Sequence, residues 1–329
     1  MGNVNTAENA KLMYEAGQDL TTFISLSDDG SGKVFTSGAD LFSGRSGYDV
    51  NIKPNGLTTG GAVSVANSGS DDVVDVAALT CYLAGILTSV GVSTDFGITR
   101  GVGDGYIVCS ITINSTGVLT EVQGAEGTSF SETRDENGGP PLIPVDSIEI
   151  AQVRLDSTNA ALIPASEIKQ VIGTHCERYD TPVWEVDYFN AQVEFVSALP
   201  TIHIGAAAKK VYAQYYEPDF AVISYSYDFV PPENSHSVNS TQVYGGTVGS
   251  RSTSLGQGAF TAMLKDGISD NLLTFKDEVL WFKFFPDRNS TPYLLCQGAL
   301  GISRTFPAGD NIQASCTISA MEVAEGITT

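Results

Sequence analysis

Residues 273–321 contain three consecutive stretches that decide the fold class. The first ends in Val279-Leu280-Trp281-Phe282-Lys283-Phe284-Phe285 and is followed by the turn-forming Pro286-Asp287-Arg288-Asn289. In Tyr293–Thr305 and Ile312–Ala320, apolar and small polar side chains alternate, and a second turn rich in Pro, Gly, Asp and Asn separates the two. Strict alternation predicts strands with one buried face. Because short polar turns join the three stretches, we predict that they form an antiparallel meander.

Similar patterns extend upstream over much of the chain, and 34 glycines indicate many turns. Strands are predicted at 48–52, 106–113, 118–122, 148–155 and 184–196. Helices are predicted at Ala7–Leu20, where apolar residues share one helical face, and at Ala259–Lys265, which the following Asp-Gly pair would end. The expected fold is therefore mainly β, an antiparallel β-sandwich or barrel with a short flanking helix. A β-rich N-terminal half with its own short helix is expected to precede it.

An irregular stretch near the middle of the chain predicts a domain boundary. Gly124–Pro144 is rich in Gly, Pro and charged residues, and it separates two groups of predicted strands. We therefore expect two domains, residues 1–160 and residues 161–329.

Pro231–Gly258 is a second, longer irregular stretch. It has only two charged residues, Glu233 and Arg251, among many Ser, Thr, Gly and Asn. Loops of this length inside a compact chain are usually functional or disordered. The stretch is expected to be a loop that contacts a partner, with Gln242-Val243-Tyr244 as its anchor, or else a mobile loop without a partner.

The charge of the chain excludes several classes of function. It carries 17 Lys and Arg against 38 Asp and Glu, a net charge of −21 at pH 7. Affinity for phosphate comes mainly from Lys and Arg, so a surface that binds nucleic acid or an anionic membrane is not expected. With 42% hydrophobic and 17% charged residues, the chain is not a disordered polyelectrolyte either. No basic leader or long apolar run is present, which indicates a soluble protein.

The residue types that carry chemistry show no grouping typical of catalysis. Three histidines lie far apart at 175, 203 and 236, and five dispersed cysteines contain no Cys-x-x-Cys pair. Reduced cysteines in a reducing compartment are the expected state. No enzymatic activity, metal or cofactor is expected. Carboxylates are abundant, so glycan cleavage by paired acids is the remaining enzymatic route, with Asp71, Asp72 and Asp75 as candidates.

The C-terminal half resembles a known family. The run WFKFFPD at 281–287 and the segment 291–320 resemble the end of major tail-tube proteins of long-tailed bacteriophages. The shared features are a strand with central glycines, here Gly298 and Gly301, a Pro-x-Gly-Asp turn at Pro307–Asp310, and a last strand of alternating small residues. The resemblance covers about residues 165–329.

The resemblance implies a structural role in the virion, after synthesis in the host cytoplasm. In the family, a β-sandwich with a flanking helix forms stacked six-fold rings with other copies, and the tube meets other tail proteins. A long loop or hairpin reaches the adjacent ring, and an acidic lumen lets DNA pass without specific binding. Because a minimal subunit is about half as long as this chain, residues 1–160 are expected to be an added domain or a second tube-like unit. The second alternative would give rings of three chains.

Two sets of residues are assigned on this basis. The candidates for subunit contacts are Gln242, Val243, Tyr244, Arg251, Trp281, Phe284, Gly298 and Ile312. The aromatic members of this set are also candidates for an ordinary sheet core. The candidates for acids that face the lumen are Asp277, Glu278, Asp310 and Glu322. The alternative functions are a tail protein that binds or cleaves receptor glycans, and a capsid or decoration protein.

Overall fold

The structure is a computed structural model that describes residues 9–103 and 105–328. The chain forms two compact units. The terminal unit contains the residues up to Leu20, Leu41–Asp49 and the residues from Tyr216 onward, whereas the inserted unit contains Thr21–Asp40 and Val50–Tyr215. The boundary expected between residues 160 and 161 does not separate these units, because strands from the two ends of the chain pair with each other.

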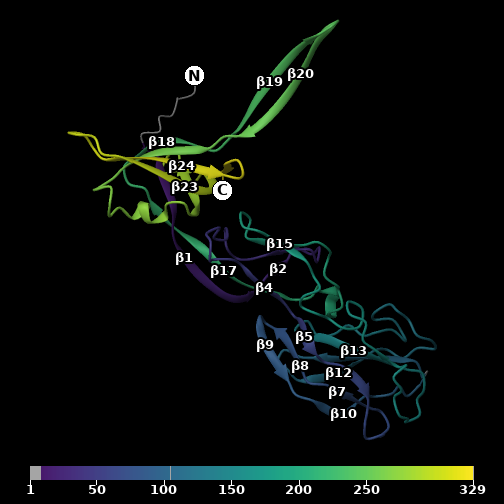
Figure 1. Ribbon diagram of the computed structural model, residues 1–329. Coiled ribbons are helices and arrows are strands. Elements are labelled where there is room, and N and C mark those ends of the chain that lie inside the picture. The colour runs from purple at the N-terminus through teal and green to yellow at the C-terminus, as the bar shows by residue number, and fades with distance from the viewer. Residues whose placement is uncertain (1–8, 104, 329) are drawn as a thin grey trace. The chain divides into compact units, whose positions relative to one another are not determined.

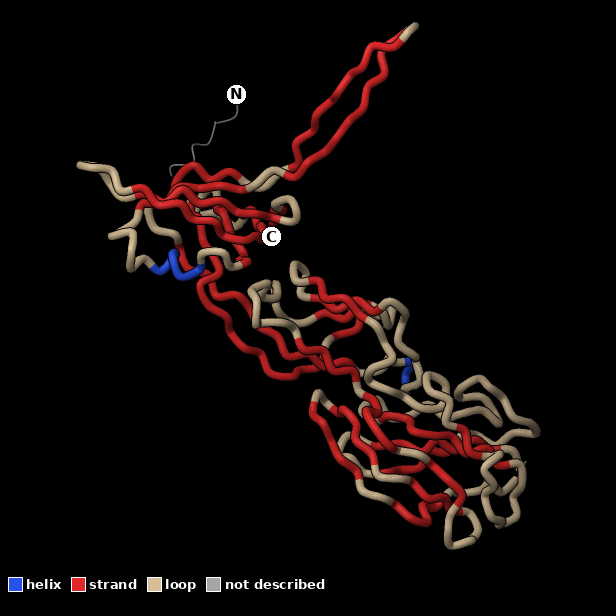
Figure 2. Tube along the Cα trace, viewed as in Figure 1, coloured by secondary structure: helices blue, strands red, loops and turns tan. Residues whose placement is uncertain are grey.

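The architecture is mainly β, as predicted (Figure 2). Strands make up 51% of the described residues and helices 3%, and the sheets are antiparallel. The helical elements η2 (Ile204–Ala206) and η3 (Asn271–Phe275) are short 3-10 turns. Among the described residues, no helix is long and apolar enough to cross a membrane.

The N-terminal helix predicted at Ala7–Leu20 is wrong, because the chain is a strand from Lys11 onward; residues 7 and 8 lie outside the described residues. Strand β1 (Lys11–Ser25) buries Leu12 and Tyr14 on one side. Its first residues pair antiparallel with β22 (Val279–Phe285). Spacing in the local sequence favoured a helix, but the far end of the chain supplies a partner strand, and tertiary pairing overrides local propensity.

The flanking helix predicted at Ala259–Lys265 is also wrong. This segment is strand β21 (Gly258–Met263), which buries Phe260 and Ala262 at alternate positions. β21 pairs along its length with β24 (Gln313–Ala320). A short apolar run fits the period of a helix or a strand equally well, so the neighbouring strand decides.

One antiparallel sheet organises the terminal unit, in the order β18–β21–β24–β23–β22–β1 (Figure 1). β18 (Ser226–Val230) lies at one end of this order, and β23 (Tyr293–Thr305) also pairs with the short β25 (Glu325–Ile327). The predicted meander is confirmed as β22, β23 and β24, which pair in sequence order. Its side chains form much of the core of the unit: Leu280, Phe282, Cys296, Leu300, Cys316 and Ile318.

Several small antiparallel sheets surround the core of the inserted unit. One sheet contains β12 (Leu119–Gln123), β11 (Ile107–Ile113), β13 (Ile148–Leu155) and β14 (Ile168–Lys169). A second contains β5 (Gly56–Gly60), β8 (Leu79–Leu83) and β9 (Ile86–Val90), and a third contains β10 (Ser93–Gly97), β7 (Val73–Val76) and β6 (Val63–Val65). The fully buried side chains between them include Val74, Cys81, Ile111, Ile150 and Val153. The strands predicted at 106–113, 118–122 and 148–155 are confirmed within a residue or two.

Two further strand predictions for this unit are confirmed in part. The stretch 184–196 is a hairpin of β15 (Trp184–Asp187) and β16 (Gln192–Phe195), because the chain turns at residues 188–191. β16 also pairs with β3 (Val34–Thr36), which pairs with β2 (Ser27–Asp28). The stretch 48–52 overlaps β4 (Asn51–Pro54), which pairs with β17 (Val211–Val222). The irregular segment Gly124–Pro144 lies inside this unit and marks no boundary.

The long loop predicted at Pro231–Gly258 is instead a β-hairpin, which we call the arm (Figures 1 and 2). β19 (Asn234–Val243) pairs with β20 (Gly246–Leu255) without a register shift. Ser, Thr and Val are compatible with strands, and Gly245 has the positive φ of 93° that a tight hairpin turn requires. Polar composition indicated a loop, but in the structure the backbone groups of the two strands pair although the strands have no buried face.

Candidate assembly surface

The arm has almost no side-chain packing of its own. Every residue from Asn234 to Ser254 is exposed, so no apolar core holds the two strands together. Cross-strand hydroxyl pairs support the backbone ladder, with Oγ–Oγ distances of 2.6 Å for Ser237–Ser252 and 2.9 Å for Ser235–Ser254. An isolated two-stranded hairpin is only marginally stable in water. A partner surface against the arm would therefore add stability.

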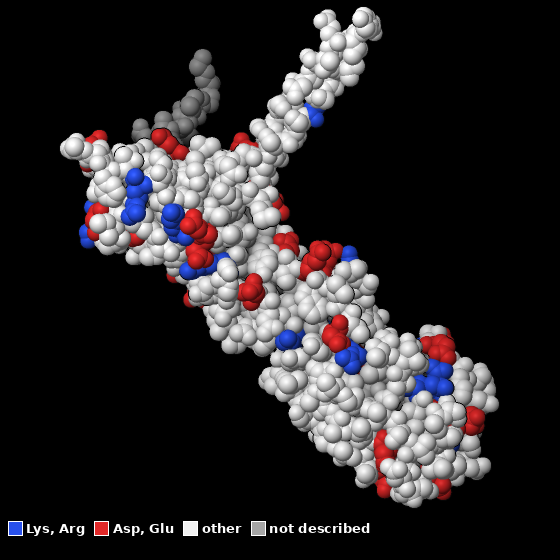
Figure 3. Space-filling model, viewed as in Figure 1, with Lys and Arg blue, Asp and Glu red and all other residues white. Residues whose placement is uncertain are grey.

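Charge distinguishes the arm from the rest of the chain. Arg251 carries the one full charge between Asn234 and Leu255, and in Figure 3 the arm is white apart from this side chain. The whole chain carries −21, so most surfaces of two copies repel each other. The arm is therefore the surface at which a second copy would meet least repulsion.

The tip of the arm presents the anchor residues predicted from the sequence. Gln242 and Val243 end β19, and Tyr244 forms the turn with its side chain fully exposed. Val243 is 46% exposed, although it is apolar. The structure thus brings Gln242, Val243 and Tyr244 together at one end of the arm, and places Arg251 further back along β20.

A groove of about 870 Å³ lies in the same terminal unit. The start of β1, the turn between β17 and β18, and β18 itself form its walls. Tyr225, Tyr227 and Phe229 line it together with Phe284 of β22. The rings of Phe229 and Phe284 stack with centroids 4.5 Å apart. The groove therefore has an aromatic wall, which suits an apolar or aromatic ligand.

Three charged residues also line the groove: Lys11, Asp228 and Arg288. Arg288 is held by the backbone, because its side chain donates to the carbonyl oxygens of Asn9 at 3.3 Å and Ala10 at 3.1 Å. Asp228 has a positive φ of 54°, which interrupts the regular pairing of β18 with β21. The lining thus combines aromatic rings with two cations and one carboxylate.

The remaining contact candidates have different environments. Trp281 is 3% exposed and its indole N–H donates to the Phe42 carbonyl at 2.8 Å, so its ring belongs to the interior of the unit. Phe284 is half-buried in the groove wall, and Ile312 is half-buried. Gly298 lies inside the sheet, where an added Cβ would be 2.7 Å from Cγ2 of Ile318. Trp281 and Gly298 therefore shape the subunit, whereas Phe284 is available to a ligand of the groove.

The candidate lumen acids lie around the meander, as their positions in the sequence imply. Asp277, Asp310 and Glu322 are exposed. Glu278 is half-buried and pairs with the Nε of Arg45 at 3.4 Å. This partner offsets the charge of Glu278, so the three exposed acids contribute more to the local negative potential.

Two of the candidate acids at 71–75, Asp72 and Asp75, have local partners in the inserted unit. Asp72 forms an ion pair with Arg100 at 2.5 Å. Asp75 accepts hydrogen bonds from the backbone N–H groups of Asn67 and Asp95, both at 3.0 Å. These bonds lower the pKa of Asp75, since they stabilise its charged form. A glycosidase acid needs a raised pKa, so the environment of Asp75 fits a structural role.

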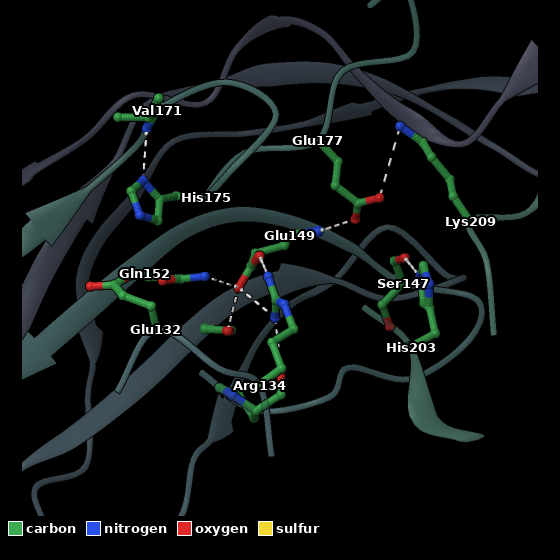
Figure 4. A network of polar contacts seen from close by, with 12 residues as sticks. Glu132, Arg134, Ser147, Glu149, Gln152, Val171, His175, Glu177, His203 and Lys209 are labelled. Atoms are coloured by element: carbon green, nitrogen blue, oxygen red, sulfur yellow. Dashed lines mark hydrogen bonds and ion pairs between the residues drawn. The ribbon is translucent and has the colours of Figure 1, made fainter. Parts of the chain in front are cut away.

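A buried polar network in the inserted unit was not predicted from the sequence (Figure 4). Glu149 is 1% exposed and accepts hydrogen bonds from Ser110, Arg134 and Gln152. Its backbone N–H donates to Glu177, which lies 3.8 Å from Lys209. Burial raises the pKa of Glu149 and lowers that of Lys209, because desolvation penalises each charged form. The possible signal was the carboxylate of Glu149 between two isoleucines at the start of β13, since buried charges need partners.

Two of the histidines lie in the same unit, but each has a local structural contact. Nδ1 of His175 accepts from the backbone N–H of Val171 at 3.1 Å, and Nε2 of His203 lies 3.1 Å from the Ser147 carbonyl oxygen. His236 is exposed on the arm. Within residues 9–103 and 105–328, no three His, Cys, Asp or Glu side chains are close enough together to hold a metal ion.

These features define a class of protein in structural terms: a mainly β chain of two units, one interrupted by the other, with an exposed arm. No protein-family model matches the chain, and no curated protein matches it. The function is therefore argued from the sequence and the geometry alone.

Proposed function

We propose that this chain is the structural subunit of a bacteriophage tail tube, and that copies of it assemble into stacked rings. The observation that carries the proposal is the terminal unit, an antiparallel sheet from which a fully exposed, nearly uncharged arm extends. An arm without packing of its own has little stability as part of a lone subunit. A second copy of the chain, built from the same parts, supplies a surface for it.

The division of the chain supports an added domain. The terminal unit makes up just over two fifths of the chain and contains both the meander and the segments that resemble tail-tube proteins. The inserted unit interrupts it within β1, after Leu20, and has several small sheets instead of one large sheet with an arm. This arrangement favours six chains in each ring over three, because each chain contributes one tube-like unit.

The charge of the chain suits passive passage of DNA. Exposed acids at Asp277, Asp310 and Glu322 would repel phosphates, and no release of counterions by Lys or Arg would hold the DNA. The repulsion acts within about 8 Å at physiological salt, so only acids that line the channel contribute.

Electron microscopy of the purified full-length chain tests the proposal. We expect rings or hollow tubes, and we expect more of them at high salt, because salt screens the repulsion between chains of charge −21. Analytical ultracentrifugation over the same salt series gives the assembled fraction. A chain that remains a monomer of 34.7 kDa at high concentration and high salt would overturn the proposal.

A further inference from the structure

The tip of the arm presents an aromatic side chain without any surface to pack against. Tyr244 is fully exposed, and the glycines at 245 and 246 leave its ring open from the C-terminal side. Scattered exposed apolar residues are ordinary. A tyrosine at the end of a projecting hairpin is different, since Tyr is enriched at the centres of protein interfaces and places a large area on few rotatable bonds.

The groove of the terminal unit has the chemistry to receive such a ring. Its volume of about 870 Å³ exceeds what one side chain fills, and the stacked rings of Phe229 and Phe284 form part of its lining. A tyrosine buries about 150–250 Å² when it is enclosed. Lys11 and Arg288 also line the groove, although Nζ of Lys11 already lies 4.2 Å from the centroid of the Phe285 ring and Arg288 donates to the carbonyl oxygens of Asn9 and Ala10. Asp228 offers an acceptor for a phenol hydroxyl.

The low charge of the arm makes it a suitable occupant from another copy of this chain. A partner that docks on this anionic protein with its own carboxylates is repelled. The arm has no carboxylate from Asn234 to Leu255, and two cations against one acid line the groove. Strands of ten residues span about 34 Å, so the tip can reach beyond the subunit that carries it.

We propose that Tyr244 at the tip of one arm binds in the groove lined by Phe229 and Phe284 of a second copy. This inference rests on the proposed self-assembly. The two surfaces are different parts of the terminal unit, so the contact is head-to-tail. Head-to-tail contacts continue into rings or open polymers instead of stopping at a dimer.

Two single substitutions separate the two sides of this contact. Tyr244→Ala removes the anchor and leaves the groove intact. Ser224→Trp fills the groove, because Ser224 lines it and is exposed, and leaves the tip intact. Each variant should raise the concentration needed for assembly by about tenfold or more, as truncation of a central interface residue does. Ser240→Ala, an exposed change in the middle of the arm, is the matched control and should assemble like the unchanged chain.

Mixing and cross-linking provide the decisive readout. Chains with Gln242→Cys, an exposed position beside the tip that keeps Tyr244, and chains with Ser224→Cys, mixed under mild oxidation, should form a disulfide-linked heterodimer. Chains with Ser240→Cys in place of Gln242→Cys should not. The five native cysteines are buried, so they leave little background. If rings form but neither substitution weakens them and no cross-link appears, the groove is wrong and the proposed tube stands. If neither rings nor cross-links form, both are wrong.

Discussion

Arg134 is predicted to be essential to the inserted unit, because it neutralises a buried carboxylate. Its guanidinium contacts both carboxylate oxygens of Glu149, which is 1% exposed. The substitution Arg134→Met keeps much of the side-chain length but leaves the charge of Glu149 unpaired. Removal of one partner of a buried ion pair destabilises a protein by about 3–5 kcal/mol. We expect the free energy of unfolding of the inserted unit to fall by that amount at pH 7.

The control is the double variant Arg134→Met/Glu149→Gln, which has no buried charge and keeps a side chain that Ser110 and Gln152 can bond. It should recover most of the lost stability. Burial raises the folded-state pKa of Glu149 above its unfolded value, so protonation favours the folded state. The difference between the single and double variants should therefore be largest above the folded-state pKa. It should shrink as the pH falls toward the unfolded value.

Urea unfolding followed by fluorescence measures these differences. The chain has two tryptophans, Trp184 in the inserted unit and Trp281 in the terminal unit. In a Trp281→Phe background, Trp184 reports on the inserted unit alone. An exposed ion pair contributes less than about 1 kcal/mol to the free energy of unfolding. If the ion pair of Arg134 behaved in this way, Arg134→Met would lower that free energy by less than about 1 kcal/mol, with no dependence on pH. That result would refute the argument that Glu149 is buried as a charge.

Three further predictions concern the terminal unit. Gly298→Ala should destabilise the unit by about 1–3 kcal/mol in thermal unfolding, because the added Cβ would lie 2.7 Å from Cγ2 of Ile318. The control Gly326→Ala should be nearly neutral, because the atom nearest to its added Cβ would be 4.0 Å away. Trp281→Phe removes the donor to the buried Phe42 carbonyl and should lower the free energy of unfolding by about 1–3 kcal/mol in urea titrations. Hydrogen bonds from Ser269 and Ile268 lower the pKa of Asp266 to about 2. Asp266→Ala should therefore be less stable than the unchanged chain at neutral pH, and this difference in the free energy of unfolding should disappear as the pH falls through about 2.

The sequence predicts strands well where the pattern is complete within one segment. Tyr293–Thr305 and Ile148–Leu155 are found at the predicted bounds, since alternation or a long apolar run is sufficient for a buried strand. β1 and β21 were predicted as helices because their local sequence does not distinguish a helix from a strand. Each is stabilised as a strand by a partner far away in the sequence. The division into units fails for the same reason, as a pairing between residues 11–14 and 282–285 leaves no trace in local composition.

Part of the candidate site could be predicted from the local sequence, whereas the rest exists only because the fold brings distant segments together. The tip residues Gln242, Val243 and Tyr244 were identified from a stretch almost without charge, and the structure places them together at an exposed turn. The groove could not be predicted, because its walls come from segments around residues 11, 225 and 284. Trp281 was assigned to contacts by residue type alone, and burial shows that it serves the interior.

The pairing of β1 with β22 also has a consequence for synthesis on the ribosome. β1 leaves the ribosome early, but its partner strand emerges only after more than 250 further residues have been made. The inserted unit lies between these strands in the chain and can fold in the meantime, since domains fold as units during translation. The sheet of the terminal unit is completed last, because closing so long a loop is slow. A nascent chain therefore lacks a finished sheet until β22 has emerged, so the early strand β1 waits without its partner while the inserted unit folds.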